Sequence, residues 1–571
     1  MLSSVAIVVA NRILVKLFAC WLLCVPLSPA SAQQSTPAAG AGTSPIHFSF
    51  RPIPFSLDSC ETPERHAPES MAGGVAIFDY DNDGYLDIFF TNGADISGLQ
   101  KTSPKYWNRL FHNNGDGTFT DVTEKAGLKG TGYDTGVAIG DFDNDGYQDI
   151  FVGGVHRNTL YHNNGDGTFT DITEKAGLAQ PDKQYGPLWS VGAAWVDVNN
   201  DGLLDLFVVN YLSWDSKKEP DCKVLGQPDY CHPKYFKATP NQLFLNKGNG
   251  TFVDISAQSG IRSHPGKGMG VGVADYDGDG LPDLFVTNDK LPNFLFHNLG
   301  NGRFEEVAFE AGVALPDVGN EISGMGLDFQ DLNNDGYPDI CLVALEHETF
   351  PIYRNNKKGG FTEITVESGM NRLSDPMAGY SPNAADFDND GWKDIFVSRG
   401  GVQSPGVAMA ASQRVNQPNT VFRNLQGEKW SALTEEAGFT SQPPSRHRGS
   451  AFGDLNHDGK LDLVVTALSA PAEIWINDSP GNNHWLELAL QGTKSNRNAI
   501  GALVRLEAGG RSQFSYVTTA SGYASSSAGP VHFGLGAAKT VDEIEIRWPS
   551  GTKQVLKNVP ADQILRIKEP L

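Results

Sequence analysis

Short acidic segments with one fixed spacing recur along this chain of 571 residues. Each has the pattern Asp-x-(Asp/Asn)-x-Asp-Gly-x-x-Asp, and the copies begin at Asp79, Asp141, Asp197, Asp275, Asp331, Asp386 and Asp454. Carboxylate and amide oxygens at alternate positions around a glycine turn are the ligands that a hard divalent cation prefers. The pattern therefore predicts about seven cation sites, with Ca²⁺ as the expected ion, and makes each site part of a repeating unit.

A short apolar run stands on both sides of every acidic segment, such as residues 74–78 and 88–90 around the first. Two such runs joined by a tight glycine-bearing loop predict a β-hairpin. An EF-hand would instead need flanking helices and a glutamate at position twelve. That position is apolar in every copy: Phe90, Val152, Val208, Val286, Leu342, Val397 and Val465. We therefore exclude the EF-hand.

Each unit continues beyond its hairpin with two further strand patterns. A third strand ends in asparagine, as at residues 109–113, 159–163 and 242–246, and a glycine-rich turn leads to a fourth, as at residues 118–123. Four strands per unit, repeated at intervals of 55 to 78 residues, predict the blades of a β-propeller. We expect an all-β chain with seven blades.

The seventh unit has no fourth strand after residues 473–477, whereas residues 47–50 precede the first acidic segment without a unit of their own. We predict that this N-terminal strand completes blade seven. Closing the ring in this way would protect edge strands that otherwise invite aggregation.

These features resemble the FG-GAP/VCBS repeat family, the propeller also found in integrin α chains, over residues 46–480. The resemblance implies that side chains at loop positions one, three, five and nine bind Ca²⁺ together with the carbonyl at position seven. The implied ligands are Asp79, Asp81, Asp83, Tyr85 and Asp87; Asp141, Asp143, Asp145, Tyr147 and Asp149; Asp197, Asn199, Asp201, Leu203 and Asp205; Asp275, Asp277, Asp279, Leu281 and Asp283; Asp331, Asn333, Asp335, Tyr337 and Asp339; Asp386, Asp388, Asp390, Trp392 and Asp394; and Asp454, Asn456, Asp458, Lys460 and Asp462.

Neutral asparagine at position three predicts weaker binding in blades three, five and seven. Acidic turns that bind no metal are the alternative, but they would not require aspartate at positions one, five and nine in every copy. Clustered carboxylates in one hairpin would repel each other without an ion, so a structural role for calcium is expected.

Residues 481–571 differ from the repeats in pattern and in charge. They hold ten Lys and Arg against seven Asp and Glu, in a chain whose net charge is −23. Residues 498–502, 521–526, 532–536 and 547–551 resemble the ASPIC/UnbV domain, and the whole layout is similar to that of bacterial ASPIC/UnbV proteins. Alternating apolar positions predict a small β-sandwich, which we expect to dock electrostatically on the acidic propeller.

The N-terminus has the pattern of an export signal. Arg12 and Lys16 precede an apolar core at residues 17–27, and Ala30 to Ala32 supply small residues. We predict a signal peptide at residues 1–32, cleaved after Ala32, a flexible linker at residues 33–45, and a secreted or periplasmic product. We predict no transmembrane segment, because no apolar stretch is long enough to span a bilayer.

Four cysteines remain after cleavage. Cys222 and Cys231, nine positions apart, are expected to form a disulfide in an oxidising compartment. A Cys/His metal site is the alternative, with His232 as the nearby imidazole. Cys341 lies in an apolar strand pattern and is interpreted as a buried thiol, and Cys60 is not assigned.

Three functions are compatible with these features. The first is an extracellular recognition or adhesion module for a protein or glycan, because long insertions carry aromatic residues at 106–107, 185–189, 211–214 and 230–236. Those aromatics could equally be packed lids. The second is a hydrolase or lyase using the central channel, with non-repeated candidates at residues 446–448 and His264. The third is a passive assembly or structural component.

No catalytic residue is assigned. The serines at 521–527 and His532 lack the spacing of a nucleophile elbow and are interpreted as turn residues. His112, His162 and His297 recur at one repeat position and are interpreted as surface or packing residues. A nucleic-acid partner is not expected, because the motifs alone hold 25 aspartates and nothing resembles a basic stripe.

Overall fold

The computed structural model describes residues 44–410 and 414–571. The predicted signal peptide and nearly all of the predicted linker lie outside these residues. Among the described residues, no helix is both long and apolar enough to cross a membrane.

Seven four-stranded antiparallel units confirm the predicted blades. Blades one to four comprise β2 (Val75–Phe78), β3 (Asp87–Phe90), β4 (Arg109–Asn113) and β5 (Phe119–Asp121); β6 (Tyr133–Gly140), β7 (Asp149–Val155), β8 (Thr159–Asn163) and β9 (Phe169–Asp171); β10 (Ser190–Val196), β11 (Asp205–Asn210), β15 (Gln242–Asn246) and β16 (Phe252–Asp254); and β18 (Gly268–Ala274), β19 (Asp283–Asn288), β20 (Phe294–Asn298) and β21 (Phe304–Glu306). Blades five to seven comprise β22 (Leu327–Gln330), β23 (Asp339–Leu342), β24 (Ile352–Asn355) and β25 (Phe361–Glu363); β26 (Gly379–Ala385), β27 (Asp394–Arg399), β28 (Thr420–Leu425) and β29 (Lys429–Leu433); and β30 (His447–Gly453), β31 (Asp462–Ala467), β32 (Pro471–Asn477) and β1 (Phe48–Ser56).

Short elements lie in the connections between blades and in the loops within them. They are α1 (Thr123–Ala126), α2 (Thr173–Ala176), α3 (Met370–Ser374), α4 (Pro405–Ala410), β12 (Lys223–Val224), β13 (Gln227–Pro228), β14 (Thr239–Pro240) and β17 (Pro265–Gly266). Apolar side chains of neighbouring blades pack together, as where Phe78 and Phe89 of blade one share a buried cluster with Ile139 and Ile150 of blade two.

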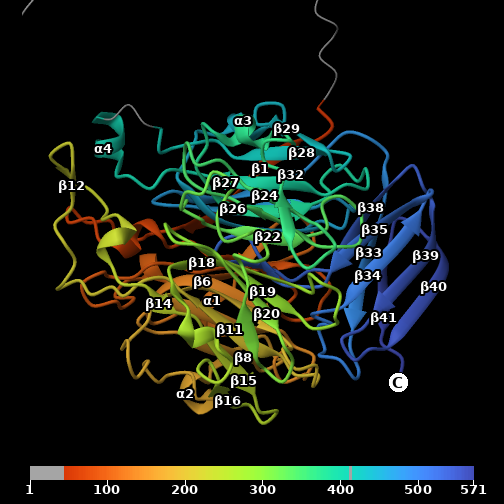
Figure 1. Ribbon diagram of the computed structural model, residues 1–571, viewed down its shortest axis with the longest axis horizontal. Helices are drawn as coiled ribbons and strands as arrows, with labels where there is room; N and C mark the ends of the chain where they lie inside the picture. Colours follow the sequence, from red (N-terminus) through yellow and green to blue (C-terminus); the bar gives the residue numbers. More distant parts are fainter. Residues whose placement is uncertain (1–43, 411–413) are drawn as a thin grey trace, which may run out of the picture. The chain divides into compact units, whose positions relative to one another are not determined.

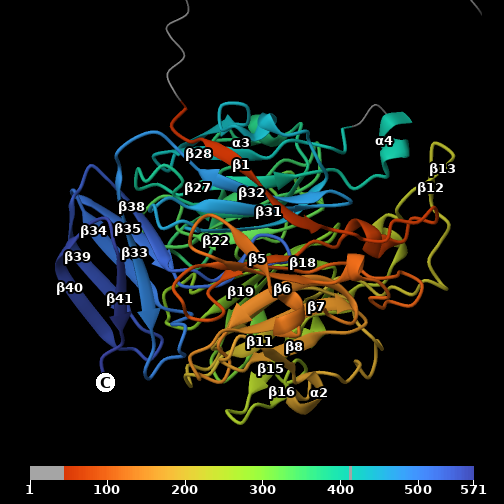
Figure 2. The same cartoon turned by 180° about the vertical axis from the view of Figure 1, so that it is seen from behind.

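Strand β1 closes the ring as predicted. It runs antiparallel to β32, with Phe48 opposite Asn477 and Phe50 opposite Trp475, and the two strands lie side by side in both views (Figures 1 and 2). The outer edge of blade seven is therefore covered by a segment more than 400 residues away in the sequence.

A repeated asparagine also joins the blades. An asparagine at the end of each third strand donates a hydrogen bond from Nδ2 to a backbone carbonyl of the preceding blade. The acceptor is at loop position two, where position one is the first Asp of the acidic segment. The pairs are Asn163 to Tyr80, Asn246 to Phe142, Asn298 to Val198, Asn355 to Tyr276, Asn424 to Leu332 and Asn477 to Phe387. Asn113 completes the circle with a 2.8 Å bond to Leu455 of blade seven.

The C-terminal segment forms the predicted sandwich of two sheets, in the order β38-β33-β41 and β35-β34-β39-β40. Its strands are β33 (His484–Gln491), β34 (Leu503–Ala508), β35 (Arg511–Tyr516), β38 (Val531–Gly536), β39 (Thr540–Arg547), β40 (Lys553–Pro560) and β41 (Ile564–Lys568), drawn in blue in Figure 1. Leu486, Val504, Ile544 and Trp548 are among the buried side chains between the two sheets.

A hairpin at residues 518–528, which we call the channel hairpin, leaves this sandwich and enters the propeller. Its strands are β36 (Ala520–Ser521) and β37 (Ser525–Ser527). Between them they contact the first strand of all seven blades: β2, β6, β10, β18, β22, β26 and β30. Strand β37 also pairs in parallel with β2, which extends blade one to six strands. The centre of the propeller is therefore filled by the chain itself.

The serines of the channel hairpin have a defined role there. The first strand of each blade has one unpaired edge, and its N–H groups need acceptors once buried. Ser525, Ser526 and Ser527 supply hydroxyl acceptors to Val75 of blade one, Ile139 of blade two and Phe452 of blade seven. Ser525 and Ser526 are buried and Ser527 is partly buried, and all three have a structural role in these contacts.

Candidate functional site

The seven acidic loops share one geometry. The carboxylate at position one accepts hydrogen bonds from the backbone N–H groups of positions five and six, at 3.1 and 3.0 Å for Asp79 in the first loop. The aspartate at position nine is buried, and Asp87 accepts bonds from Tyr80 N and Asn113 N. The same contacts recur in every loop, and the position-five aspartate also accepts from the backbone N–H of position seven, at 2.8 Å for Asp83 and Tyr85, so backbone hydrogen bonds hold the aspartates of positions one, five and nine.

Burial destabilises the charged form of these carboxylates. It raises the pKa of Asp79 to about 6 and that of Asp87 to about 9, and neighbouring aspartates add to both shifts. Ligating oxygens of Asp79, Asp81 and Asp83 all lie within 4.8 Å of one another. A divalent cation at this point would remove the repulsion, so the residues of the first loop fit calcium.

Loop position four links the loops to each other. Asn82 has a left-handed backbone (φ 59°) and donates to Gly146 O of the next loop at 2.9 Å. Equivalent bonds run from Asn144 to Gly202, Asn200 to Gly280, Asn334 to Gly391, Asn389 to Gly459 and His457 to Gly84. Sequence analysis missed this role, although the recurrence of Asn at a position that needs positive φ was the available signal.

Histidines stand beside three of the loops. His112 Nδ1 lies 3.4 Å from Asp81 and 3.3 Å from Asp87, and His162 and His297 occupy the same place in blades two and four. The interpretation of these residues as surface or packing residues was therefore incomplete, because each contacts two aspartates of its own loop.

The C-terminal sandwich covers the face of the propeller that carries the loops. Residues of the sandwich lie against the position-six glycine in six of the seven loops, while Gly280 of loop four has open space. They are Arg566 at loop one, Arg497 at loop two, the backbone of Lys494 at loop three, Phe514 at loop five, Arg511 at loop six and Trp485 at loop seven. Most of these covering residues are basic, and Arg497 N donates to Asn144 of loop two at 2.7 Å. The sandwich thus docks directly on the acidic loops, and an electrostatic contribution to this docking stays a prediction.

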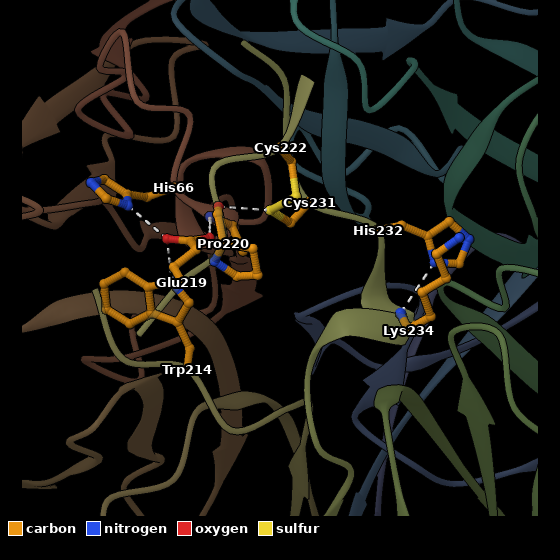
Figure 3. Close-up of a disulfide and its surroundings, with 9 residues drawn as sticks. His66, Trp214, Glu219, Pro220, Cys222, Cys231, His232 and Lys234 are labelled. Carbon is orange, nitrogen blue, oxygen red and sulfur yellow. Dashed lines mark hydrogen bonds and ion pairs between the residues drawn. A yellow bond between two sulfur atoms is a disulfide. The ribbon is translucent and has the colours of Figure 1, made fainter. Parts of the chain in front are cut away.

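The opposite face is covered by an excursion at residues 215–237 between β11 and β15. Cys222 and Cys231 form the predicted disulfide, with their Cα atoms 5.3 Å apart, so the Cys/His metal alternative was wrong. Figure 3 shows how Glu219 anchors the excursion: it contacts His66 Nδ1 at 2.6 Å and accepts from Trp214 Nε1 at 2.9 Å. Asp229 is also buried and accepts from Ser404 N of blade six.

The excursion places apolar side chains in solvent. Leu225 at the tip of the β12–β13 hairpin is 67% exposed, Val224 is 43% exposed and Tyr235 is 57% exposed. The other aromatics of the insertions mostly pack inward, since Tyr106, Trp189, Tyr211 and Trp214 are buried. Of the nine aromatic residues considered as recognition anchors, four are therefore buried, four are partly buried and only Tyr235 is exposed.

Of the non-repeated candidates for catalysis, residues 446–448 are buried and His264 is partly buried. His447 is buried, with Nδ1 2.8 Å from Arg399 O and Nε2 3.1 Å from Glu473. Arg448 is buried too and donates to Ser70 O. His264 packs edge-on against Phe294 and Phe296. A substrate in the central channel would have to occupy the space of the channel hairpin. Cys341 is a buried free thiol as expected, and the Cys60 thiol accepts from Tyr106 OH.

Comparison with known proteins gives both domains a family. A family model described as FG-GAP-like repeat matches residues 79–152, 141–208, 235–286, 275–342 and 331–397, together just over half of the chain. A second, described as ASPIC and UnbV, matches residues 492–571.

Curated relatives match this chain to different extents. Cartilage acidic protein 1 of Homo sapiens is 28% identical over 388 residues, which is 66% of this chain and 53% of the relative, so the chain spans about half the length of that protein. Cartilage acidic protein 1 of Xenopus tropicalis is 26% identical over 543 residues, covering 91% of this chain and 75% of the relative. Integrin alpha-4 of Xenopus laevis is 29% identical over 153 residues, 23% of this chain and 14% of the relative.

Proposed function

Because the chain belongs to the family of FG-GAP-like repeat proteins, we propose that it is a secreted recognition module for a protein or glycan at an extracellular surface. In this proposal calcium in the acidic loops is structural. The domain limits are those expected from the sequence: a signal peptide at 1–32, a linker at 33–45, the propeller at 46–480 and the ASPIC/UnbV domain at 481–571.

The observation that carries the proposal is the disulfide-braced excursion. Its exposed Val224, Leu225 and Tyr235 stand on a support held by the Cys222–Cys231 bond and by two buried carboxylates, Glu219 and Asp229. Large apolar side chains on a rigid, exposed hairpin lose little conformational entropy on binding, which favours a recognition role. The disulfide is also consistent with an oxidising, extracellular location.

Two alternatives receive less support. The space in which an enzyme of this architecture would bind a substrate is filled by the channel hairpin, and the loop face is covered by the sandwich. A purely passive structural role would not require an apolar tip in solvent. The apolar character of the tip favours a protein over a glycan, since sugar recognition relies on more polar groups.

The experiment is a binding screen with a matched pair of variants. Fluorescently labelled protein is applied to a panel of extracellular proteins and to a glycan array, in calcium and in EGTA. Leu225→Asp should abolish binding to the captured partner, whereas Val318→Asp, an equally drastic change at a 75% exposed site in the loop before blade five, should preserve it. Equal effects of both changes, or unchanged binding by Leu225→Asp, would contradict the proposal.

A further inference from the structure

Loop six contains a cation of its own. Arg423, on the third strand of blade six, places Nε 2.7 Å from Asp388 and Nη2 2.8 Å from Asp390. These are the carboxylates of loop positions three and five, two of the positions expected to ligate calcium. The Asp388 side chain is only 5% exposed, so this pair is shielded from solvent on the carboxylate side.

No other blade in the described part of the chain has this arrangement. The same repeat position holds His112, His162 and His297 in blades one, two and four, Leu245 in blade three and Ile476 in blade seven. Blade five has Arg354, but its guanidinium donates to Gly427 O of the next blade instead of its own loop. The exposed Lys357 is 3.2 Å from Asp335 in loop five through a single, mobile ammonium.

A guanidinium and a calcium ion compete for the same oxygens. Arginine stays protonated at any physiological pH and matches two carboxylates with a planar fork. A leucine at this position carries no charge, and an imidazole, unlike a guanidinium, has a neutral form at physiological pH that does not oppose the ion. Calcium could enter loop six only by displacing two charge-assisted hydrogen bonds and placing its own charge beside Arg423.

The C-terminal sandwich is attached to this same loop by several polar contacts. Asn483 Nδ2 donates to Asp388 O at 2.8 Å, Gly536 N donates to Asn389 O at 2.8 Å, and His532 Nε2 lies 2.7 Å from Asn389 Oδ1. Arg511 donates to Asp390 O and lies over Trp392. Loop six is thus tied to the C-terminal sandwich by hydrogen bonds from both its backbone and its side chains.

We propose that loop six takes no calcium, that Arg423 replaces the ion there, and that the loop serves as a metal-independent docking point for the C-terminal sandwich. This inference rests on the proposed calcium binding of the other loops. It lowers the expected number of calcium ions from seven to six, and it removes Asp386, Asp388, Asp390, Trp392 and Asp394 from the set of calcium ligands.

The test is the calcium content of three variants, measured by elemental analysis after equilibration in calcium and gel filtration. Arg423→His copies the arrangement of blades one, two and four, and Arg423→Leu copies blade three. Both should bind one calcium more than the wild type, which should bind six. Arg354→His, the matched control at the same position of blade five, should leave the number unchanged.

The outcomes separate this inference from the calcium proposal itself. Seven ions in the wild type, or no gain in either Arg423 variant, would overturn the inference while leaving calcium binding intact. No calcium in any variant would overturn both. Circular dichroism and gel filtration identify a variant that fails to fold, and because two chemically different replacements are used, a folding failure in one leaves the other as the test.

Discussion

At the scale of single residues, the ring depends on one asparagine per blade. Asn298 donates from Nδ2 to Val198 O of the preceding blade and to Pro282 O of its own, both at 3.0 Å. The side chain is buried, so its removal would leave two carbonyls without partners. The asparagine at the end of the third strand therefore links two blades. The hydrogen bonds that it makes explain why this position is asparagine in every blade.

We expect Asn298→Ala to lower the free energy of unfolding by about 2 to 6 kcal/mol, because it orphans two buried acceptors and each costs ~1 to 3 kcal/mol. Urea unfolding in saturating calcium measures this. Gln258→Ala, at an exposed site in the same half of the ring, is the control and should change the midpoint little. Equal midpoints for both variants would show that the inter-blade bonds are not important for stability.

A second residue, Glu69, gives the protein a pH dependence away from the loops. Its carboxylate is buried and accepts from Thr62 N and Thr62 Oγ1, and burial raises its pKa from 4.5 to about 7. Since the folded state holds this proton more tightly, the stability contribution is complete below about pH 4.5 and is lost as pH rises through about 7.

Glu69→Gln should therefore gain stability relative to the wild type as pH rises. The gain should be near zero at about pH 5 and about 2 to 3 kcal/mol at about pH 8, since one pKa unit corresponds to about 1.4 kcal/mol. Paired urea titrations at the two pH values measure it. A difference that does not change with pH, or that changes in the opposite direction, would contradict the account.

At the scale of elements, two segments distant in sequence from the strands they contact hold the propeller together. They are β1 at the outer edge of blade seven and the channel hairpin at the centre of the ring. Tyr523 at the tip of the hairpin is completely buried and donates to Met71 O at 2.7 Å. Its ring packs edge-on against Tyr380, with centroids 5.4 Å apart. The hairpin is thereby fixed from the loop face through to the opposite face.

Tyr523→Ala should destabilise the protein by about 3 to 5 kcal/mol, the usual cost of removing a buried aromatic ring. Tyr523→Phe keeps the ring and loses only the hydrogen bond, so about 1 kcal/mol is expected. Thermal unfolding and the rate of proteolysis within residues 481–571 measure both. If Tyr523→Ala melted like the wild type, the hairpin would not be a structural centre.

Removal of β1 should expose the edge of β32. A chain that starts at Leu57 should aggregate or pair through that edge, because unpaired strand edges are templates for association. Light scattering measures this, and a synthetic peptide of residues 46–56 added in excess should suppress it. A truncated chain that stays monomeric without the peptide would contradict the closure by β1.

At the scale of the whole molecule, local patterns were enough to predict the blades, the closure by β1 and the sandwich, because each repeats or completes a visible unit. The channel hairpin could not be predicted, since its partners are backbone groups up to about 450 residues away and Ser525 to Ser527 look like an ordinary turn. The contact between Arg423 and loop six was also hidden, because repeat position alone does not tell which way an arginine turns. Likewise, the aromatic insertions did not reveal which side chains pack inward.

Each acidic loop lies between two strands of a blade, and all but loop four donate a side-chain hydrogen bond to the next loop. In most blades the loop also contacts the C-terminal sandwich. Their buried carboxylates have raised pKa values because of burial, which is unfavourable for a fold at neutral pH unless a cation is present. Calcium should therefore stabilise the propeller and the docked sandwich as one unit.

The most direct test of this claim is thermal unfolding in saturating calcium and after exhaustive chelation. Each site adds about 2.7 kcal/mol at a calcium concentration 100 times its Kd, so several sites together should raise the melting temperature by on the order of 10 °C or more. We predict one cooperative transition that falls by that amount in EGTA and returns when calcium is restored. An unchanged melting temperature after chelation would contradict a structural role for calcium.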